Sequence, residues 1–167
     1  MKQLRIRSVK TSDAQGIVDI YNLYVTTTTV SFEEVPVTVD EIHRRIEMVQ
    51  LQQLPWLCVD YGNELAGYAY ASRWRERSAY RFTAETTIYL AQVFTGRGIG
   101  KVLYSELLEQ VRSAGMHAVM AVITLPNPAS VALHEELGFE KVAHFTEVGF
   151  KFNKWIDVGY WQLIIRN

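Results

Sequence analysis

The stretch Glu85–Leu108, ETTIYLAQVFTGRGIGKVLYSELL, decides the fold of this chain. Its Thr-Ile-Tyr-Leu segment is β-branched and aromatic, which is typical of a strand. The three glycines that follow, Gly96, Gly98 and Gly100, let the backbone turn tightly and leave no side chain to hold a ligand away. Apolar residues then recur at helical spacing, at Ile99, Val102, Leu103, Leu107 and Leu108. The stretch therefore predicts a strand, a glycine-rich turn and a helix.

The glycine-rich turn is expected to bind an anion. A helix begins with unpaired N–H groups and the positive end of its dipole, and phosphate is the usual anion there. Two common phosphate motifs do not fit. A Walker P-loop needs more residues between its glycines than separate Gly96 from Gly100, and Lys101 is followed by Val102. The dinucleotide pattern G-x-G-x-x-G fails because Leu103 stands at the third glycine.

Composition bounds the class of protein. The 167 residues fit a single domain over 1–167, with 49% hydrophobic and 21% charged residues. A net charge of −1 gives no broad basic surface for nucleic acid. We expect no membrane span, because no run approaches about 18 apolar residues, and no signal peptide. The single cysteine, Cys58, predicts a cytoplasmic location. The four histidines show no metal-ligand spacing, so no metal is expected.

The rest of the chain alternates strands and helices. Ser12 with Gln15 and Thr38 with Glu41 are spaced as capping boxes that open two helices, and Thr26–Phe32 is too β-branched to continue the first of them. Gly62-Asn63 indicates a hairpin. Strands are expected at 3–9, 56–61, 65–72, 85–90, 118–123, 143–148 and 156–165, the last two as an antiparallel pair around Asn153-Lys154. The later helices are expected at 98–114 and 129–137. The order β-α-α-β-β-β-α-β-α-β-β predicts an α/β fold, a mixed sheet with helices on both faces.

The glycine turn resembles a known family motif. Its sequence, Thr95-Gly96-Arg97-Gly98-Ile99-Gly100, is similar to the [QR]-x-x-G-x-[GA] pyrophosphate turn of the GNAT acyl-CoA N-acetyltransferases. Thr95 departs from the usual Gln or Arg, a small loss if backbone amides do most of the binding. The element order resembles the GNAT fold over essentially the whole chain. The resemblance implies a mostly antiparallel sheet, with acetyl-CoA bound where it splays after the fourth strand.

A second segment, Asn127–Phe139, resembles the family pattern N-x-x-[AS]-x-x-[LF]-[YH]-x-x-x-G-[FY]. Asn127, Ser130 and His134 share one face of the expected helix, so all three are expected beside the cofactor. His134 could act as a base or protonate the departing thiolate, although the family more broadly carries Tyr there. The alternative is an N-cap Asn127 with Ser130 and His134 facing solvent.

A closer resemblance covers scattered segments along the whole chain. AYASRWRERSAYRFTAETTIYL, LPNPAS, LHEELGF and VGFKFNKWIDVGYWQL resemble the phosphinothricin N-acetyltransferases and the methionine sulfoximine/sulfone acetyltransferases. This implies acetyl transfer to the α-amino group of a small amino acid with a tetrahedral, oxygen-rich head group. It also implies a role in herbicide or antibiotic resistance, and a homodimer.

Glu85 is the candidate base. An α-ammonium must lose a proton before it attacks a thioester, and a nearby carboxylate can accept it. Glu85 stands at the head of an apolar strand, where partial burial would raise its pKa; the alternative is a solvated edge-strand residue. The thioester carbonyl is expected to bind backbone N–H groups of Ile88, Tyr89 and Leu90, which would stabilise the oxyanion.

The acceptor is expected to contact the basic loop before that strand. The guanidinium groups of Arg75 and Arg77 suit carboxylate, phosphinate and sulfone oxygens. Tyr80 lies on the same loop, and Phe32 is expected as an apolar wall. The alternative for each arginine is a solvated loop charge.

The sequence therefore favours an acetyl-CoA-dependent N-acetyltransferase that works by direct transfer in a ternary complex. Cys58 is not expected to carry the acyl group, because its strand is expected to be buried. Two alternatives stay open. Another amine acceptor on the same fold is disfavoured if it is cationic, because the loop is basic. A non-catalytic acyl-CoA-binding protein is disfavoured by the presence of both Glu85 and His134.

Overall fold

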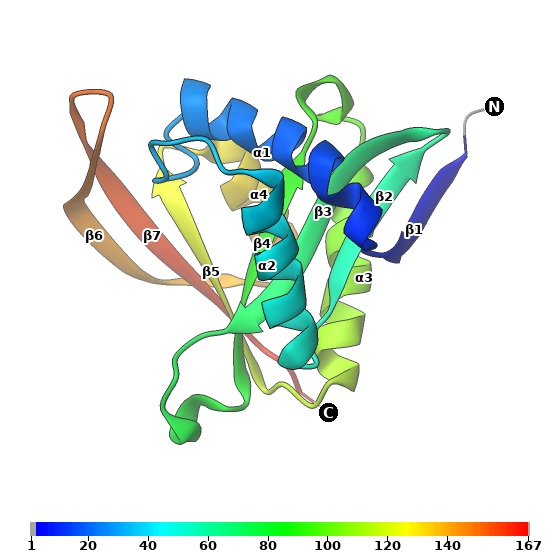
Figure 1. Ribbon diagram of the computed structural model, residues 1–167. Helices are drawn as coiled ribbons and strands as arrows, with labels where there is room; N and C mark the ends of the chain where they lie inside the picture. Colours follow the sequence, from blue (N-terminus) through cyan, green and yellow to red (C-terminus); the bar gives the residue numbers. More distant parts are fainter. Residues whose placement is uncertain (1–2, 167) are drawn as a thin grey trace.

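The computed structural model describes residues 3–166, built around one seven-stranded sheet (Figure 1). The strand order is β1-β2-β3-β4-β5-β7-β6. Only β4 and β5 pair in parallel; the other neighbours are antiparallel. The strands are β1 Leu4–Ser8, β2 Trp56–Tyr61, β3 Glu64–Arg73, β4 Thr83–Leu90, β5 Ala118–Leu125, β6 Glu140–Lys151 and β7 Lys154–Ile164. The predicted α/β class and element order are confirmed.

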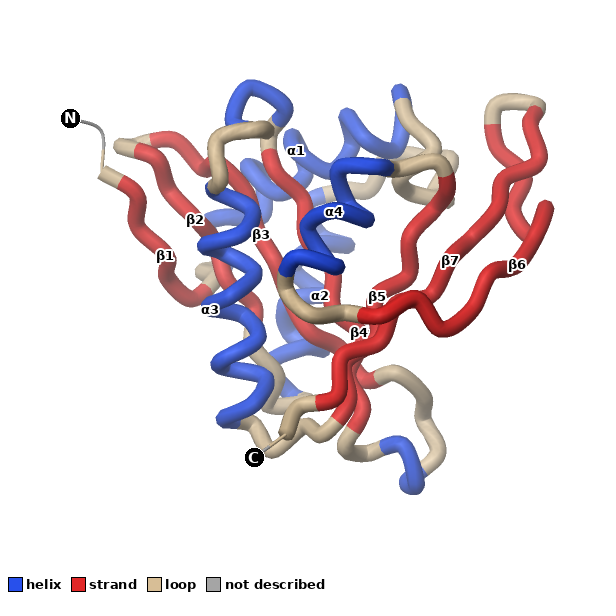
Figure 2. The backbone as a smooth tube through the Cα atoms, turned by 180° about the vertical axis from the view of Figure 1, so that it is seen from behind, coloured by secondary structure: helices blue, strands red, loops and turns tan. Residues whose placement is uncertain are grey.

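Within residues 3–166, four α-helices cover the sheet, two on each face. They are α1 Ala14–Thr27, α2 Val39–Leu51, α3 Ile99–Ser113 and α4 Pro128–Glu136. α1 and α2 lie on the face toward the viewer in Figure 1, and α3 and α4 lie on the face seen in Figure 2. None of the helices within residues 3–166 combines the length and the apolar character that crossing a membrane requires.

The core lies between these helices and the sheet. α3 buries Leu103, Leu107 and Val111 completely, and α1 does the same with Ile17 and Val25. Full burial of such a side chain is worth about 1.5–3 kcal/mol. The apolar stripes that predict the helices are therefore the surfaces that hold them on the sheet.

Of the two predicted helix caps, the one at Thr38 is confirmed and the one at Ser12 is wrong. Thr38 caps α2 as expected, since its hydroxyl accepts from the Glu41 N–H at 3.1 Å. The Ser12 prediction is wrong, because Ser12 lies in a 3₁₀ turn over Thr11–Asp13 and α1 begins at Ala14. The carboxylate of Asp13 accepts from the Lys10 N–H at 2.7 Å.

The end of α1 also differs from the sequence prediction. The helix continues through Thr26 and Thr27, which were expected in the loop. Their hydroxyls donate to the carbonyls of Asn22 and Leu23 at 2.8 and 2.5 Å, so these β-branched residues find hydrogen-bond partners within the helix. The irregular segment begins only at Thr28.

The C-terminal hairpin is longer than predicted. β6 and β7 reach Lys151 and Lys154, and the turn between them is Phe152-Asn153 rather than Asn153-Lys154. Both turn residues have positive φ, 51° and 57°. Two residues with positive φ suit the twist of a tight hairpin.

The parallel pair β4–β5 opens the sheet. The two strands are in register at Thr83–Glu85 of β4 with 118–120 of β5, and then diverge (Figure 1). Beyond Glu85 one edge of β4 therefore lacks a partner strand. The gap lies at the end of β4 that leads into the glycine turn and α3.

Candidate active site

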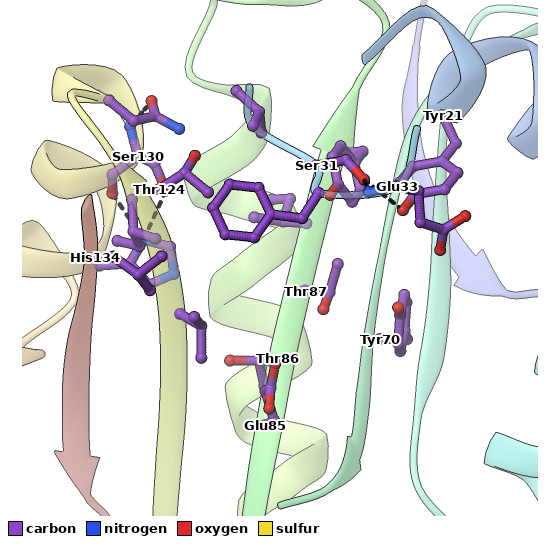
Figure 3. Close-up of a pocket in the computed structure, with 18 residues that line it drawn as sticks. Tyr21, Ser31, Glu33, Tyr70, Glu85, Thr86, Thr87, Thr124, Ser130 and His134 are labelled. Atoms are coloured by element: carbon purple, nitrogen blue, oxygen red, sulfur yellow. Dashed lines mark hydrogen bonds between the residues drawn. The ribbon is translucent and has the colours of Figure 1, made fainter. Parts of the chain in front are cut away.

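Two cavities meet where β4 and β5 diverge. The central cavity, of about 510 Å³, lies among the loop after α1, strands β4 and β5, and α4 (Figure 3). The glycine-turn cavity, of about 440 Å³, lies between the start of α3 and α4. Both are lined by Val30, Ile88, Tyr89, Asn127 and Ser130. The two cavities therefore adjoin along these residues and together make up one cleft.

The glycine turn presents backbone to this cleft. Gly96 and Gly98 have φ of 71° and 75°, which non-glycine residues rarely adopt. Gly98 is the N-cap of α3, and Gly100 sits so close to Leu90 that a Cβ would lie 3.3 Å from its side chain. Thr95 lines the cavity with these three glycines. The first N–H groups of α3, which have no partner within the helix, are thus available to an anion.

The other two turn residues direct their side chains elsewhere. The Arg97 guanidinium lies over the Phe94 ring, 5.6 Å from its centroid, and Ile99 is buried in the core. Neither lines the cavity. Binding by Arg97 and Ile99 would therefore come from their backbone.

The predicted oxyanion residues Ile88, Tyr89 and Leu90 do not all direct their backbone N–H groups to the same side of β4. The Ala91 N–H donates to the Ala66 carbonyl of β3. Since backbone groups alternate in direction along a strand, those of Tyr89 face β3, whereas those of Ile88 and Leu90 face the cleft. Tyr24 donates its hydroxyl to the Leu90 carbonyl at 2.6 Å.

Glu85 is the last residue of β4 that pairs with β5, and it lines the central cavity (Figure 3). It is half-buried. Burial raises the pKa of its carboxyl above the usual 4.5, and the Arg75 charge opposes this. A carboxylate with a raised pKa is a better proton acceptor near neutral pH. The alternative of a solvated edge residue does not describe this position.

His134 is buried at the cavity wall, only 3% exposed, so it does not face solvent. Its Nδ1 lies 2.7 Å from the Ser130 carbonyl, and its Nε2 lies 3.0 Å from the Tyr104 hydroxyl. A carbonyl can only accept, so Nδ1 carries the proton and Nε2 accepts from Tyr104. Tyr104 in turn lies 2.6 Å from the Thr86 hydroxyl.

The charge state of His134 follows from this environment. Burial lowers its pKa below the usual 6.5, although the bond to the Ser130 carbonyl acts in the opposite direction. The ring is therefore neutral at physiological pH, with both nitrogens engaged.

Asn127 and Ser130 lie at the junction of the two cavities. The Asn127 side chain accepts from the Ser130 N–H at 3.2 Å and so caps α4. The capping part of the alternative interpretation is therefore correct as well. Because a cap fixes where a helix begins, Asn127 also fixes how α4 meets the cleft.

The basic loop lies apart from the central cavity. Arg75, Arg77 and Tyr80 line a separate hollow on the β3–β4 connection, which projects at the lower edge in Figure 1. The Arg75 guanidinium stacks over Trp74, 4.9 Å from the ring centroid. Phe32, by contrast, lines the central cavity.

Several lining residues were missed from the sequence. Lys101 of α3 and Glu136 of α4 form an ion pair of 2.5 Å at the glycine-turn cavity. Glu33 lines the central cavity. Lys101 could have been found, because it directly follows Gly100 in the first helical turn. Glu33 and Glu136 carry no comparable signal, since their positions depend on packing between distant elements.

Two observations concern a metal site and a cysteine nucleophile. Within residues 3–166 no group of three or more His, Cys, Asp or Glu side chains could hold a metal ion. Cys58 is fully buried, and burial raises the pKa of its thiol to about 12. The thiol is therefore protonated and a poor nucleophile.

The sequence pattern of the acetyltransferase (GNAT) domain matches residues 6–159. This chain belongs to the GNAT acetyltransferase family. It is an acyltransferase, and the cleft between β4 and β5 is its candidate active site.

Three relatives show which members of this family the chain is similar to. A phosphinothricin N-acetyltransferase of Streptomyces viridochromogenes is 38% identical over 96% of this chain and 87% of its own length. An L-methionine sulfoximine/L-methionine sulfone acetyltransferase of Salmonella typhimurium is 33% identical over 96% and 94%. A phosphinothricin acetyltransferase from Sinorhizobium meliloti, solved in complex with acetyl-CoA, superposes with a TM-score of 0.94 and is 35% identical; 97% of this chain and 88% of that chain are covered.

Proposed function

We propose that this chain is an acetyl-CoA-dependent N-acetyltransferase. Its acceptor is the α-amino group of a small amino acid with a tetrahedral, oxygen-rich head group, such as phosphinothricin or methionine sulfoximine or sulfone. The observation that carries the proposal is the half-buried Glu85 in a cavity continuous with the glycine turn. The names of the relatives support the acceptor class.

The cofactor half of the proposal uses the start of α3. The pyrophosphate of acetyl-CoA would accept from backbone N–H groups of Thr95–Gly100, with Lys101 as a nearby positive charge. Its thioester carbonyl would lie against the free edge of β4. There the N–H groups of Ile88 and Leu90 would stabilise the developing oxyanion.

In the proposed mechanism, Glu85 is the base that removes a proton from the α-ammonium of the acceptor. An α-ammonium whose pKa lies about 2–3 units above ambient costs roughly 3–4 kcal/mol to deprotonate. Glu85 would accept that proton, directly or through water. The amine nitrogen then attacks the thioester carbonyl and forms the amide bond, and the C–S bond breaks as the tetrahedral intermediate collapses. The second proton lost by the nitrogen passes to the departing thiolate, directly or through water, so that coenzyme A leaves as the thiol. No acyl-enzyme forms.

The role of His134 is proposed as positioning. Its Nδ1 proton is held by the Ser130 carbonyl and its Nε2 by Tyr104, so neither nitrogen is free to exchange a proton. It therefore orients Ser130, which lines both cavities.

The acceptor would be held by Phe32 and attracted by Arg75 and Arg77. Arg75 already acts on Glu85 through its charge. We also propose a homodimer, supported by the apolar surface of the β6–β7 hairpin, where Val148, Phe150 and Trp155 are 60%, 51% and 64% exposed. A cytoplasmic location remains a proposal from cysteine usage.

An acceptor screen tests the function. The protein is incubated with acetyl-CoA and phosphinothricin, methionine sulfoximine or methionine sulfone, and thiol release and product mass are followed. Turnover is expected, and none with the N-acetylated forms of the same compounds. Turnover with spermidine alone would assign another amine. Calorimetric binding of acetyl-CoA without turnover on any amine would indicate a non-catalytic acyl-CoA-binding protein. Expression should also protect sensitive bacteria against phosphinothricin.

A further inference from the structure

The loop between α1 and α2 forms one wall of the central cavity. Val30, Ser31, Phe32 and Glu33 all line it, and the segment has no regular secondary structure. Figure 3 shows Ser31 and Glu33 facing β4, across from His134. An irregular segment has few hydrogen bonds of its own to fix its position, so its shape depends on neighbouring elements.

Neighbouring elements hold this loop from three sides. From α1, Tyr21 bonds the Ser31 hydroxyl at 2.8 Å. From α2, Arg45 pairs with Glu33 at 2.8 Å. From β6, Lys151 donates to the Ser31 carbonyl at 2.6 Å, a contact between residues 120 positions apart.

The Lys151 contact is unusual because the lysine is buried, with 2% of its surface exposed. Lysine is almost never fully buried unless it is paired. Here its ammonium lies 5.1 Å from the Phe152 ring centroid, in addition to the Ser31 carbonyl. Burial lowers its pKa, and the charges of Glu34 and Glu33 act against this. A charge in such a place is costly, so the contact it makes is a strong constraint on the loop.

A second contact from the same strand reaches Phe32. Gly149 lies so close to it that a Cβ there would be 2.2 Å from the Phe32 ring. The ring therefore occupies the space that any other side chain at 149 would need. A register shift between Phe145 and Gly149 accompanies this contact, with Glu147 at a φ of 51°.

We propose that Lys151 is a positioning residue for the amino-acid acceptor: through the Ser31 carbonyl it holds the loop so that Phe32 packs on Gly149 and walls the central cavity. The end of the C-terminal hairpin thus sets the shape of the acceptor site. This rests on the proposed function for the identity of the substrate, but the structural coupling does not.

The coupling between Lys151 and the loop should affect the binding of one substrate and not the other. Ser31 and Phe32 line the central cavity only, whereas the glycine turn lines only the other cavity. Loss of the Lys151 contact should therefore weaken acceptor binding and leave acetyl-CoA binding unchanged. A general loss of stability would affect both.

The first test replaces Lys151 by Met, which keeps the length of the side chain and removes its charge. We expect the acceptor KM to rise roughly tenfold, as for loss of a charged hydrogen bond, with the acetyl-CoA KM unchanged. Lys154→Met is the matched control, because Lys154 is the exposed cross-strand partner of Lys151. It should leave both KM values as in the unaltered protein.

A second test moves Phe32 without touching the lysine. Gly149→Ala forces the ring away, so it should raise the acceptor KM in the same way. In a double-mutant cycle, Lys151→Met should add little to Phe32→Ala if the lysine acts through the ring. Additive effects of the two substitutions would overturn the assignment.

Hydrogen exchange gives a readout that needs no acceptor. Amides of residues 28–35 should exchange faster in Lys151→Met than in Lys154→Met, while those of α3 stay unchanged. Equal exchange in the two variants would refute the coupling even if the protein proves to act on another amine. Absence of turnover in the unaltered protein, together with faster exchange in Lys151→Met, would instead refute only the proposed function.

Discussion

At the scale of single residues, the position of Glu85 is decided by a change of pairing. It is the last residue of β4 that pairs with β5, so its backbone is held by the sheet while its side chain lies in the opening. Burial raises its pKa, and the carboxylate must be deprotonated to act as a base. The raised pKa of Glu85 and its proposed role as base therefore predict how the reaction rate depends on pH.

We predict that kcat/KM falls as pH drops through the raised pKa of Glu85. Glu85→Gln should lower the rate by about 10²–10⁴-fold, because the base is lost, and should abolish this acidic limb. The pH–rate profile of both proteins measures it. Glu140→Gln, an exposed position on β6, serves as control. An acidic limb that persists unchanged in Glu85→Gln would remove the assignment.

His134 predicts a pH dependence of stability rather than of rate. Because its pKa is lowered in the folded protein, the unfolded chain takes up the proton first as pH falls below about 6.5. The free energy of unfolding should therefore decrease there, and His134→Gln should lose that part of the decrease. Urea unfolding at pH 8 and pH 5 should show a smaller stability gap between the two proteins at pH 5. A gap that stays constant would contradict the neutral buried ring.

At the scale of elements, the strand–turn–helix unit shows how a local sequence makes a site. Gly96 and Gly98 turn the chain, and α3 then presents its first N–H groups at the cavity. The turn was predictable because glycine spacing acts locally. Its bounds, Gly98 as N-cap and Ile99 as first helical residue, agree with the expected start.

We predict that Gly98→Ala separates cofactor binding from stability. Alanine at a φ of 75° costs about 1–2 kcal/mol, although no atom lies within 4 Å of the added Cβ. Gly115 follows the other end of α3 with a φ of 81° and the same open space, so Gly115→Ala is the matched control. Urea unfolding should show similar losses for both. Calorimetry should show weaker acetyl-CoA binding only for Gly98→Ala; equal binding by both variants would place the cofactor elsewhere.

At the scale of the whole molecule, the cleft brings together two cavities, and neither is lined by a cysteine. The central and glycine-turn cavities share five lining residues, so both substrates can be bound together. Cys58, which is buried on β2 between β1 and β3, lines neither cavity. This arrangement supports the proposed direct transfer within a ternary complex.

We predict intersecting initial-rate lines when acetyl-CoA and acceptor are varied together. Cys58→Ala should keep this pattern and a similar kcat, because the buried thiol takes no part. Parallel lines, which indicate a covalent acyl-enzyme, would contradict direct transfer. A large loss of kcat in Cys58→Ala with its fold intact would do the same.

The sequence by itself determined the element order and the glycine turn, and it offered the Asn127 cap of α4 as an alternative. These depend on spacing along the chain, where propensity and periodicity act over a few residues. Through alternation and a family resemblance it also proposed Glu85 and Phe32 as site residues, and both line the central cavity. Its errors at Ser12, Thr26 and the C-terminal turn fall at element ends, where one hydrogen bond decides the boundary.

Only the tertiary structure decided where distant side chains meet. The sheet splays because β4 and β5 stop pairing after Glu85, and no local pattern marks that point. The engagement of both nitrogens of His134, the separate hollow of Arg75, and the 120-residue contact of Lys151 all depend on strand order and on packing between elements. Such contacts are set by the free energy of the whole fold, because each joins segments that meet only once the sheet has formed.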